Sequence, residues 1–569
     1  MMNKPWLAQY EGGVPRTIEI PKIPVFQFLT DTAHLYPDKV ATSFYGKTIT
    51  YRQLEEKTKR FATFLLTLGV QKGDRIAVML PNIPQCVIAY YGALKTGAVV
   101  VMFNPLYVER EIEQQLVDCG ATVIVALDIF YPRIGAVFSK TSLRHVVITS
   151  VKDALPWPLA LVYPIKAKKE GQWARVPNLP HIHRMPLSES ATALISSVLP
   201  SDLALLQYTG GTTGTPKGVM LTHENLVANT LQCRAWTPTL QKGEEVFLAV
   251  IPFFHVYGMS VCMNLAIALG AKLVLLPRFA TKDVLTAIQK SSVTVFMGVQ
   301  AMYTAINNYP NIKQFNLSSI RVCISGAGPL HVEVQKQFET LTGGRLVEGF
   351  GLSEASPVTH ANLIHGKRKK ASIGLPVPNT DARIVDLETG TKEVPCGEVG
   401  ELVVKGPQVM QGYWNHKEET AKVIRDGWLH TGDMAKQDEE GFFFIVDRKK
   451  DMIKTRGENV YPREVEEVLF RYDKVVDAVV VGLPDPFGGE KIKAYIVVKP
   501  GATVTTDELL DFCKQHLARF KVPQEIEVRT SLPKTIIGKV LRRVLVEEEL
   551  KKSQLHHIKG SSKPPSKEM

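Results

Sequence analysis

Cysteine is sparse in this chain of 569 residues, and its spacing shows no pattern. The seven cysteines are Cys86, Cys119, Cys233, Cys262, Cys323, Cys396 and Cys513. No two of them are close enough in sequence to form a metal knuckle or a redox pair. The odd number and low density favour reduced, mostly buried thiols.

Long apolar runs are also missing. The N-terminal segment MMNKPWLAQYEGG has no apolar core, so we expect no secretory signal. The most hydrophobic window, 257–276, is interrupted by Gly270 and Lys272 and is short for a membrane span. It predicts a buried helix followed by a buried strand.

A second apolar segment, 154–169, is shorter and contains three prolines, which argues against a membrane-spanning helix. Two interpretations stay open. The segment could touch a membrane surface, because Trp157 and Tyr163 lie near Lys166, Lys168 and Lys169. It could also be a packed surface insertion, and the absence of a clear helical periodicity favours this second interpretation.

No basic stripe interleaved with aromatic residues is found, which disfavours a nucleic-acid-binding protein. The net charge is nevertheless +12, from 68 Lys and Arg against 56 Asp and Glu. This balance favours anionic partners such as nucleotides, phosphorylated cofactors or an acidic membrane surface.

What is present is an alternation of helix-period and strand-period segments. Helices are expected at 51–69, 84–96, 109–118 and 224–236, and strands at 75–80, 98–102, 122–126, 203–208, 293–297 and 320–324. Such alternation predicts mostly parallel sheets covered by helices. The two runs, before and after residue 200, predict an α/β protein with two packed α/β halves.

After about residue 380 the strands become shorter, which predicts a small β-rich lobe. A compact α+β unit should follow, with helices at 462–471, 506–519 and 540–551 and strands at 475–482 and 491–498. We therefore expect a large N-terminal domain at 1–447, a hinge at 448–451, a small mobile α+β C-terminal domain at 452–550 and a disordered basic tail at 551–569.

The segment YTGGTTGTPKGV at 208–219 follows a predicted strand. Its glycines let successive N–H groups converge on an anion, while threonine hydroxyls and Lys217 add donors and charge. These groups suit a triphosphate. The segment is not a Walker loop, and taken alone it could equally be a flexible surface loop.

This loop resembles the phosphate-binding signature of the ANL superfamily of adenylate-forming enzymes. Further motifs follow in that family's order: FFHVYGM (253–259), SGAGPL (325–330), EGFGLSEAS (348–356), GELVVKGPQVMQGYWN (400–415), DGWLHTGDMA (426–435), VDRKKDMIKTRGENVYPREVE (446–466) and PKTIIGKVLRR (533–543). The resemblance covers roughly residues 30–550. The whole sequence most resembles bacterial long-chain fatty-acid–CoA ligases, which implies an acyl-CoA synthetase-like fold.

The resemblance implies which residues bind nucleotide and CoA. They are Tyr208, Thr209, Gly210, Gly211, Thr212, Thr213, Gly214, Thr215, Lys217, Gly218, Gly326, Ala327, Gly328, Glu348, Gly349, Phe350, Gly351, Ser353, Asp433, Arg448, Arg456, Gly457 and Glu458. Asp433 and Arg448 would contact the ribose, and Phe350 would stack on adenine. The chain departs from the family pattern at Phe350 and Ser353, where tyrosine and threonine are usual, and in the order of SGAGPL.

Catalytic roles are implied for four residues. Lys539 would stabilise the charge that builds up during adenylation. Glu354 would meet the Mg²⁺ bound to ATP, because a hard cation prefers carboxylate oxygen. Lys454 would act in the second half-reaction, after a rotation at the hinge residue Lys450. His255 would lie between the acyl site and the thiol tunnel, although a lone histidine in an aromatic run is more often a packed residue.

The expected acyl site is apolar, with Trp236, Val299, Met302 and Tyr303 on its wall. Together with the resemblance, this apolar wall implies a long-chain fatty acid as substrate, with ATP, Mg²⁺ and coenzyme A. The alternatives are a medium-chain or aryl acid, and a carrier protein as acceptor. A nucleotide-binding scaffold without turnover would be marked by loss of Lys539 or Glu354, and both are present. We expect a cytoplasmic protein; peripheral membrane contact and a homodimer stay open.

Overall fold

The structure is a computed structural model that describes residues 4–171, 173–186, 197–209, 216–455, 458–485, 489–499, 501–535 and 540–560. The chain divides into two compact units. The first unit comprises Met1–Ala382, Val404–His430 and Glu439–Phe442, and the second comprises Arg383–Val403, Thr431–Asp438 and Phe443–Met569. The predicted domain boundaries at 447 and 452 stay a prediction.

An eight-stranded sheet forms one half of the first unit. Its order is β19 (Gly412–Tyr413), β9 (Lys217–Thr222), β8 (Leu203–Thr209), β4 (Val99–Met102), β3 (Arg75–Met79), β5 (Val123–Leu127), β6 (His145–Thr149) and β7 (Ile182–Arg184). The strands from β8 to β7 run parallel, and β9 and β19 add antiparallel pairs at one edge. The short apolar runs of β4 and β5 are fully buried, as expected of a parallel sheet covered by helices.

A nine-stranded sheet forms the other half. Its order is β16 (Leu375–Pro376), β15 (Val358–Ala361), β14 (Arg345–Gly351), β13 (Val322–Ser325), β12 (Val295–Gly298), β10 (Val246–Ala249), β11 (Lys272–Leu275), β1 (Val40–Phe44) and β2 (Lys47–Thr50). The central pairs are parallel, and antiparallel pairs close both edges. Two α/β halves are thus confirmed.

The division of the chain between these halves differs from the prediction. The N-terminal strands β1 and β2 join the sheet built mainly from residues after 240, and β8 and β9 join the sheet built from residues 75–184. Hydrophobic periodicity reports which face of a strand is buried but carries no information on its neighbour. The boundary drawn at residue 200 was therefore wrong.

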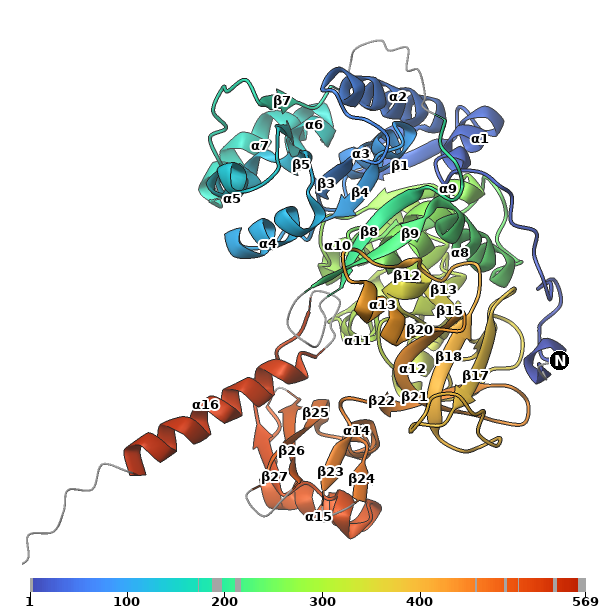
Figure 1. The fold of residues 1–569 in the computed structure, drawn as a ribbon, viewed down its shortest axis with the longest axis vertical. Helices are drawn as coiled ribbons and strands as arrows, with labels where there is room; N and C mark the ends of the chain where they lie inside the picture. The colour runs from blue at the N-terminus through green and yellow to red at the C-terminus, as the bar shows by residue number, and fades with distance from the viewer. Residues whose placement is uncertain are drawn as a thin grey trace, which may run out of the picture. The chain divides into compact units, whose positions relative to one another are not determined.

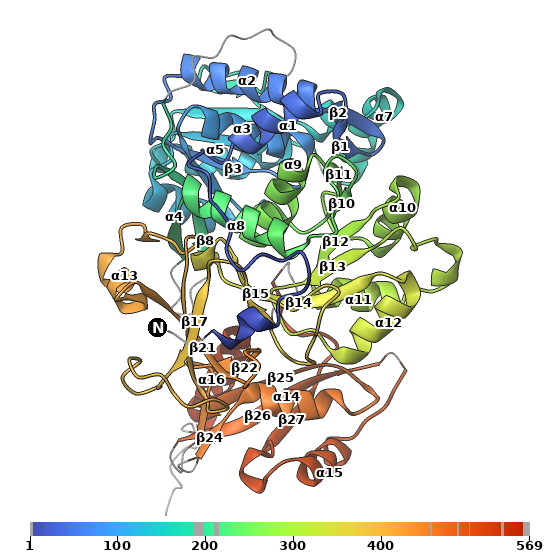
Figure 2. The same cartoon turned by 90° about the vertical axis from the view of Figure 1, so that its right-hand side faces the viewer.

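Helices cover the two sheets of the first unit. They are α1 (Gln27–Leu35), α2 (Tyr51–Thr67), α3 (Pro84–Lys95), α4 (Glu109–Cys119), α5 (Tyr131–Val137), α6 (Val151–Ala154), α8 (His223–Trp236), α9 (Leu265–Leu269), α10 (Thr281–Ser291), α11 (Gln300–Asn307), α12 (Val332–Thr342) and α13 (Lys417–Val423). The Thr222 hydroxyl accepts a hydrogen bond from Asn225 N and caps α8. α8 contacts β8 and β9 of one sheet, while α9 contacts β11 of the other (Figures 1 and 2).

The two apolar windows have different outcomes. The window 257–276 forms a buried π-helix, η4 (Tyr257–Asn264), then α9 and the strand β11, which confirms the prediction. The window 154–169 forms a helix, α7 (Trp157–Lys169), of which Ala167 is the one buried residue. The segment is thus a surface insertion, but the expected packing was wrong for most of its apolar side chains, which are exposed. None of the helices in the described ranges has the length and apolar composition to cross a membrane.

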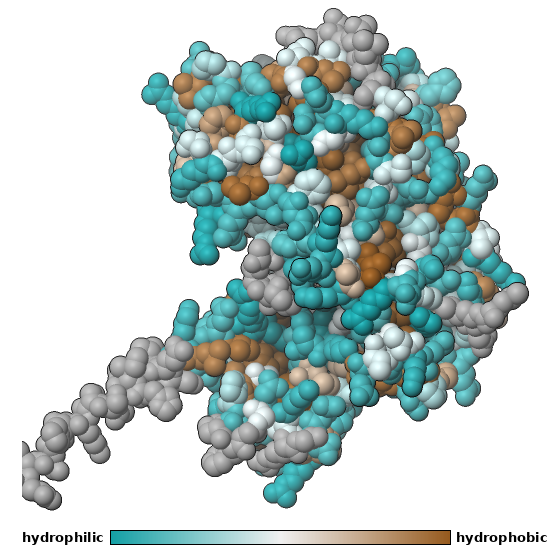
Figure 3. Space-filling model, in the orientation of Figure 1, coloured by the Kyte–Doolittle hydropathy of each residue, from teal (hydrophilic) through white to brown (hydrophobic). Residues whose placement is uncertain are grey.

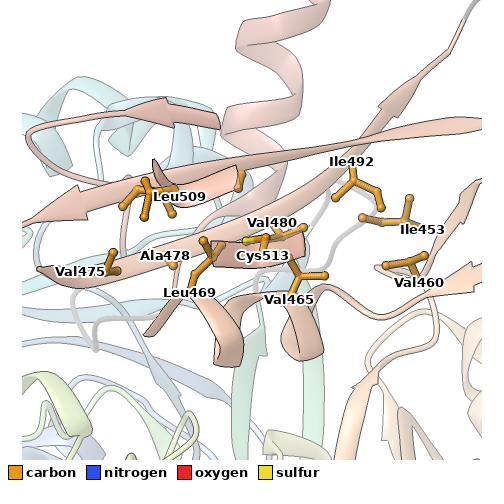
Figure 4. Close-up of a cluster of buried hydrophobic side chains, with 12 residues drawn as sticks. Ile453, Val460, Val465, Leu469, Val475, Ala478, Val480, Ile492, Leu509 and Cys513 are labelled. Atoms are coloured by element: carbon orange, nitrogen blue, oxygen red, sulfur yellow. The ribbon is translucent and has the colours of Figure 1, made fainter. Parts of the chain in front are cut away.

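The second unit holds most of a short-stranded sheet and an α+β core. The sheet contains β17 (Asp381–Val385), β18 (Gly400–Lys405), β20 (Ile424–Arg425), β21 (Trp428–Gln437) and β22 (Phe443–Arg448). The core contains β23 (Ile453–Thr455), β24 (Glu458–Val460), α14 (Pro462–Phe470), β25 (Val475–Pro484), β26 (Glu490–Val498), α15 (Thr506–His516) and β27 (Glu525–Val528). Their inward side chains gather into one apolar cluster (Figure 4).

The last helix, α16 (Arg542–Gly560), is longer than predicted. The sequence led us to expect disorder from residue 551, but the helix continues to Gly560. The residues from 551 to 559 include lysine, glutamine and leucine, which favour helix, and no proline. The rest of the predicted tail, 561–569, lies outside the described residues.

Arg542 joins α16 to the core of the second unit. Its guanidinium donates to Glu466 Oε1 at 2.7 Å and to the carbonyl of Val480 at 3.2 Å, and it lies 3.4 Å from Asp451 Oδ2. Burial raises the pKa of Glu466, and the neighbouring Arg542 opposes that rise. The largely buried carboxylate therefore depends on this arginine.

We predict that Arg542→Met lowers the free energy of unfolding of the second unit by about 3 kcal/mol, because it leaves the buried Glu466 carboxylate without its cation. Thermal or denaturant unfolding measures the change. Arg543→Met is the matched control. Arg543 forms an exposed pair with Glu547, and its loss should change stability by no more than about 0.5 kcal/mol. Equal effects of the two variants would contradict the role given to Arg542.

Candidate functional site

The predicted phosphate loop connects two neighbouring antiparallel strands. β8 ends at Thr209 and β9 begins at Lys217, and these two residues are register partners. The two ends of the loop are thus fixed by the sheet. The loop residues Gly210, Gly211, Thr212, Thr213, Gly214 and Thr215 lie outside the described residues.

Two aromatic residues pack against Gly218, at the start of β9. A Cβ added to Gly218 would lie 3.2 Å from the ring of Tyr208 and 3.3 Å from Trp414, so the position has little room for a side chain. The Tyr208 hydroxyl donates to the Asp118 carboxylate. The Trp414 indole N–H donates to the Asp118 carbonyl at 3.1 Å, and the Trp414 amide donates to Gly218 O at 2.7 Å. Residues from three distant segments therefore fix the start of β9.

Lys217 is paired with a carboxylate of α13. Its Nζ lies 2.6 Å from Glu419 Oε2, and Glu419 Oε1 lies 2.6 Å from Lys422. These two lysines lower the pKa of Glu419 to about 2. Glu419 is therefore ionised at neutral pH. The Lys217 ammonium also lies 5.4 Å from the centre of the Tyr413 ring, at a distance suited to a cation–π contact.

Tyr413 joins Lys217 to the predicted metal-binding carboxylate. Its hydroxyl donates to Glu354 Oε1 at 2.8 Å. Glu354 itself is half-buried, and its backbone carbonyl accepts from Met410 N at 2.8 Å. A half-buried carboxylate oxygen suits Mg²⁺, which is usually bound by one or two carboxylates together with substrate phosphates. The residues present therefore fit the predicted metal.

The predicted adenine ledge packs against the π-helix. A Cβ added to Gly326 would lie 3.2 Å from the ring of Tyr257. The Tyr257 hydroxyl donates to the carbonyl of Ile324 at 2.8 Å. Ala327 has a positive φ of 63°, and Gly328 follows with open space around it. The buried Glu348 carboxylate accepts from Leu330 N at 3.2 Å, so Glu348 stabilises the turn that carries the ledge.

The segment predicted to hold the base continues along β14. A Cβ on Gly349 would lie 3.0 Å from Ile324, and one on Gly351 would lie 2.2 Å from the carbonyl of Pro357. The half-buried Phe350 ring packs edge-on against His360, with ring centres 6.1 Å apart. Burial lowers the pKa of His360 to about 3, so that ring is neutral at ordinary pH. Ser353 begins the single turn that carries Glu354.

The two predicted ribose-binding residues lie together in the second unit. Asp433 on β21 and Arg448 on β22 are cross-strand partners, and Arg448 Nε lies 2.7 Å from Asp433 Oδ1. Asp433 is almost fully buried, whereas the Arg448 side chain is partly exposed. The arginine holds the carboxylate in one orientation. The sequence placed these residues in separate motifs, and the sheet brings them into contact.

The remaining predicted residues of the second unit lie on turns and short strands. Lys450 follows β22 in a turn. Lys454 lies on β23 with its side chain exposed, and its backbone N–H donates to Glu490 Oε2 at 2.8 Å. Glu458 begins the paired strand β24. Arg456, Gly457 and Lys539 lie outside the described residues.

Of the predicted acyl-site residues, Trp236 and Tyr303 are the most tightly held. The Trp236 indole N–H donates to Asn362 O at 3.1 Å, and its ring meets Tyr10 edge-on. The Tyr303 hydroxyl donates to the carbonyls of Phe296 and Ile324 at 2.9 Å. These are contacts of core residues, so their role toward an acyl chain stays a prediction.

The other predicted residues of the acyl site and its gate are Val299, Met302 and His255. Val299 and Met302 are buried at the start of α11. His255 precedes the π-helix, and its Nδ1 accepts from Tyr257 N at 3.2 Å. A short π-helix is frequently found at a functional site, which is consistent with the position of His255.

Sequence reasoning missed three residues that hold the site. They are Tyr413, Glu419 and Asp118. Tyr413 falls within the motif at 400–415, so its presence there was a usable signal. Glu419 and Asp118 lie in ordinary charged helices and carried no signal, because their partners are 202 and 90 residues away in sequence.

Comparison with known proteins gives a consistent result. Residues 29–414 match the family described as AMP-binding enzyme, and residues 464–539 match the AMP-binding enzyme C-terminal domain. The chain is 49% identical over 562 residues to a long-chain-fatty-acid–CoA ligase of Bacillus subtilis, covering 98% of this chain and 100% of that protein.

Two solved structures are similar throughout. ATP-bound MatB from Rhodopseudomonas palustris matches with a TM-score of 0.80 and 28% identity, covering 93% of this chain and 99% of that one. The O-succinylbenzoate coenzyme A synthetase of Bacillus subtilis, in complex with ATP and magnesium ion, matches with a TM-score of 0.76 and 28% identity, covering 92% and 99%.

We predict that Lys217→Gln weakens ATP binding by about 10- to 100-fold, because a hydrogen bond to a charged group contributes about 1.5–3 kcal/mol. Equilibrium binding of ATP to the purified protein measures the change. Lys422→Gln is the matched control, since Lys422 pairs with the same carboxylate but is exposed. If ATP affinity falls equally in both variants, or in neither, Lys217 does not bind the ATP phosphates.

Proposed function

The chain belongs to the AMP-binding enzyme family, and we propose that it is an ATP-dependent long-chain fatty-acid–CoA ligase. It activates the fatty acid as an acyl-adenylate and then transfers the acyl group to CoA, with release of AMP and pyrophosphate. The observation that carries this proposal is the pairing of a phosphate-site lysine, Lys217, and a metal-site carboxylate, Glu354, through one tyrosine, Tyr413. Near-full-length similarity to a long-chain-fatty-acid–CoA ligase supports the choice of substrate.

The first half-reaction takes place at the α-phosphorus. A carboxylate oxygen of the fatty acid attacks it, a new P–O bond forms, and the bond to the bridging oxygen of pyrophosphate breaks. Negative charge grows on the leaving pyrophosphate and on the α-phosphate. Lys217 binds the leaving group, and Lys539 stabilises the charge near the reacting oxygens.

Mg²⁺ bound to ATP would be held by Glu354 and would supply positive charge against the phosphates. Tyr413 orients the Glu354 carboxylate through its hydroxyl. Asp433 binds the ribose hydroxyls as an acceptor, and Arg448 keeps that carboxylate in place.

The second half-reaction takes place at the acyl carbonyl. The sulfur of CoA, as thiolate, attacks the carbonyl carbon, a C–S bond forms and the C–O bond to AMP breaks. Lys454 and Glu458 lie on paired strands of the second unit, and we assign them with Arg456 and Gly457 to this step. A rotation about Lys450 would exchange the two sets of residues between the half-reactions.

The acid and the acceptor have alternatives of the same chemical class. A medium-chain or aryl acid would use the same adenylation residues, and a carrier protein could replace free CoA. The apolar side chains Trp236, Val299 and Met302 favour an alkyl chain. A homodimer, a cytoplasmic location and a contact with a membrane surface are further proposals.

We predict AMP and pyrophosphate as products when the protein is supplied with ATP, Mg²⁺, CoA and palmitate or oleate. The rate should rise from octanoate to palmitate and should be lower with benzoate. Product chromatography across this series measures both points. ADP in place of AMP would overturn the proposed reaction, and benzoate as the best acid would favour the aryl alternative.

A second prediction separates the two catalytic lysines. Lys539→Ala should slow acyl-adenylate formation by about 100-fold or more, because it removes transition-state charge stabilisation, while sparing CoA attack on supplied acyl-adenylate. Lys454→Ala should show the reverse pattern. Each half-reaction is followed alone, by pyrophosphate release and by thioester formation. Equal losses in both half-reactions would contradict the assignment of either lysine.

A further inference from the structure

The helix α7 exposes large apolar side chains over most of its length. Trp157 is 77% exposed, Leu161 60% and Ile165 72%. The spacing of four residues places these three on one face of the helix. Leu159 and Val162 are also about half exposed. Scattered apolar residues are normal on a protein surface, but a contiguous patch usually marks an interaction site.

The position of α7 explains why this patch is left uncovered. The helix lies in the connection between β6 and β7, the last two strands at one edge of the eight-stranded sheet. A crossover helix inside a sheet would be packed between neighbours. Here the helix adjoins α6, and Ala167 is its one buried residue. In Figure 3, apolar atoms lie among hydrophilic ones over the lobe in which Figure 1 places α5, α6 and α7.

Basic groups border the apolar face. Lys166, Lys168 and Lys169 lie in the last turn, one and two residues apart, and all three are exposed. The stretch from 152 to 170 contains four lysines against two carboxylates, of which Glu170 lies 3.9 Å from Lys166. Lys168 lies over the ring of the exposed Trp173, 5.3 Å from its centre. The half-buried Tyr163 adds a third aromatic ring to the helix region.

We propose that α7 docks on an anionic membrane surface, with Trp157, Leu161 and Ile165 inserted at the interface and the lysines against lipid headgroups. Exposed apolar side chains and lysines on one helix both favour binding to such a surface. Tryptophan favours the boundary between headgroups and acyl chains. The chain's net charge of +12 acts in the same direction.

This inference rests on the proposed function for its purpose. A long-chain fatty acid partitions into membranes, so an enzyme docked there meets its substrate at high local concentration. The docking itself depends only on α7 and its lysines. The two claims can therefore fail separately.

The test is binding of the full-length protein to vesicles. We expect sedimentation with vesicles of phosphatidylcholine and phosphatidylglycerol in equal parts, and little with phosphatidylcholine alone. Trp157→Ser/Leu161→Ser/Ile165→Ser should lower the partition coefficient by about tenfold or more, because burial of these side chains drives interfacial binding. Lys166→Gln/Lys168→Gln/Lys169→Gln should remove the preference for anionic vesicles and the dependence on salt.

The matched control is Leu35→Ser/Leu106→Ser/Val108→Ser, which changes three other exposed apolar residues. It should bind vesicles as the unaltered protein does. Unaltered vesicle binding by the α7 variants, or an equal loss in the control, would overturn the proposal. Sedimentation velocity tests the alternative partner. If the protein does not bind vesicles but forms a dimer that the α7 apolar variant abolishes, the patch binds a second copy of the chain instead.

Activity distinguishes this proposal from the proposed function. With octanoate, which is soluble, the α7 variants should release AMP at the unaltered rate, which also shows that they are folded. With palmitate supplied in anionic vesicles, their rate should fall. If the unaltered protein releases no AMP with any acid, the proposed function is contradicted. The vesicle-binding result then still tests the docking proposal on its own.

Discussion

A nucleotide-activating site must keep a lysine for phosphate and a carboxylate for metal close together without letting them neutralise each other. In this protein Tyr413 meets that constraint. Its ring faces the Lys217 ammonium, and its hydroxyl donates to Glu354. The lysine takes its counter-charge from Glu419 instead. In the proposed function, Lys217 binds the incoming triphosphate and Glu354 binds its cation.

Much of the surrounding structure serves to place these three residues. β8 and β9 fix the ends of the loop, and Gly218 allows the Tyr208 ring and the Trp414 Cβ to lie close to it. Both rings are tied to Asp118 on α4. A single acidic residue near the end of a helix therefore supports a site built from segments that are far apart in sequence.

Local pattern predicted the elements well and their assembly less well. Strands and helices follow from hydrophobic periodicity, which acts over a few residues. The sheets that β1 and β8 join do not follow from local pattern, because strand pairing depends on contacts between segments that are distant in sequence. The exposure of the apolar side chains of α7 was missed for the same reason, since such side chains are usually buried and only the position of α7 at a sheet edge leaves them uncovered.

The residues of the candidate site likewise differ in whether the sequence could predict them. Lys217, Glu354, Asp433 and Arg448 could be named because each stands in a recognisable motif. Glu419 and Asp118 could not, since their importance comes only from partners brought close by the fold. The contact between Asp433 and Arg448 likewise appears only once β21 and β22 are paired.

The central claim is that the fatty-acid carboxylate attacks the α-phosphorus of ATP. Its most direct test is turnover of palmitate labelled with ¹⁸O in both carboxylate oxygens, followed by mass spectrometry of the products. The account predicts that the AMP carries one ¹⁸O atom and that the pyrophosphate carries none. Label in pyrophosphate, or AMP without label, would contradict attack at the α-phosphorus by the acid.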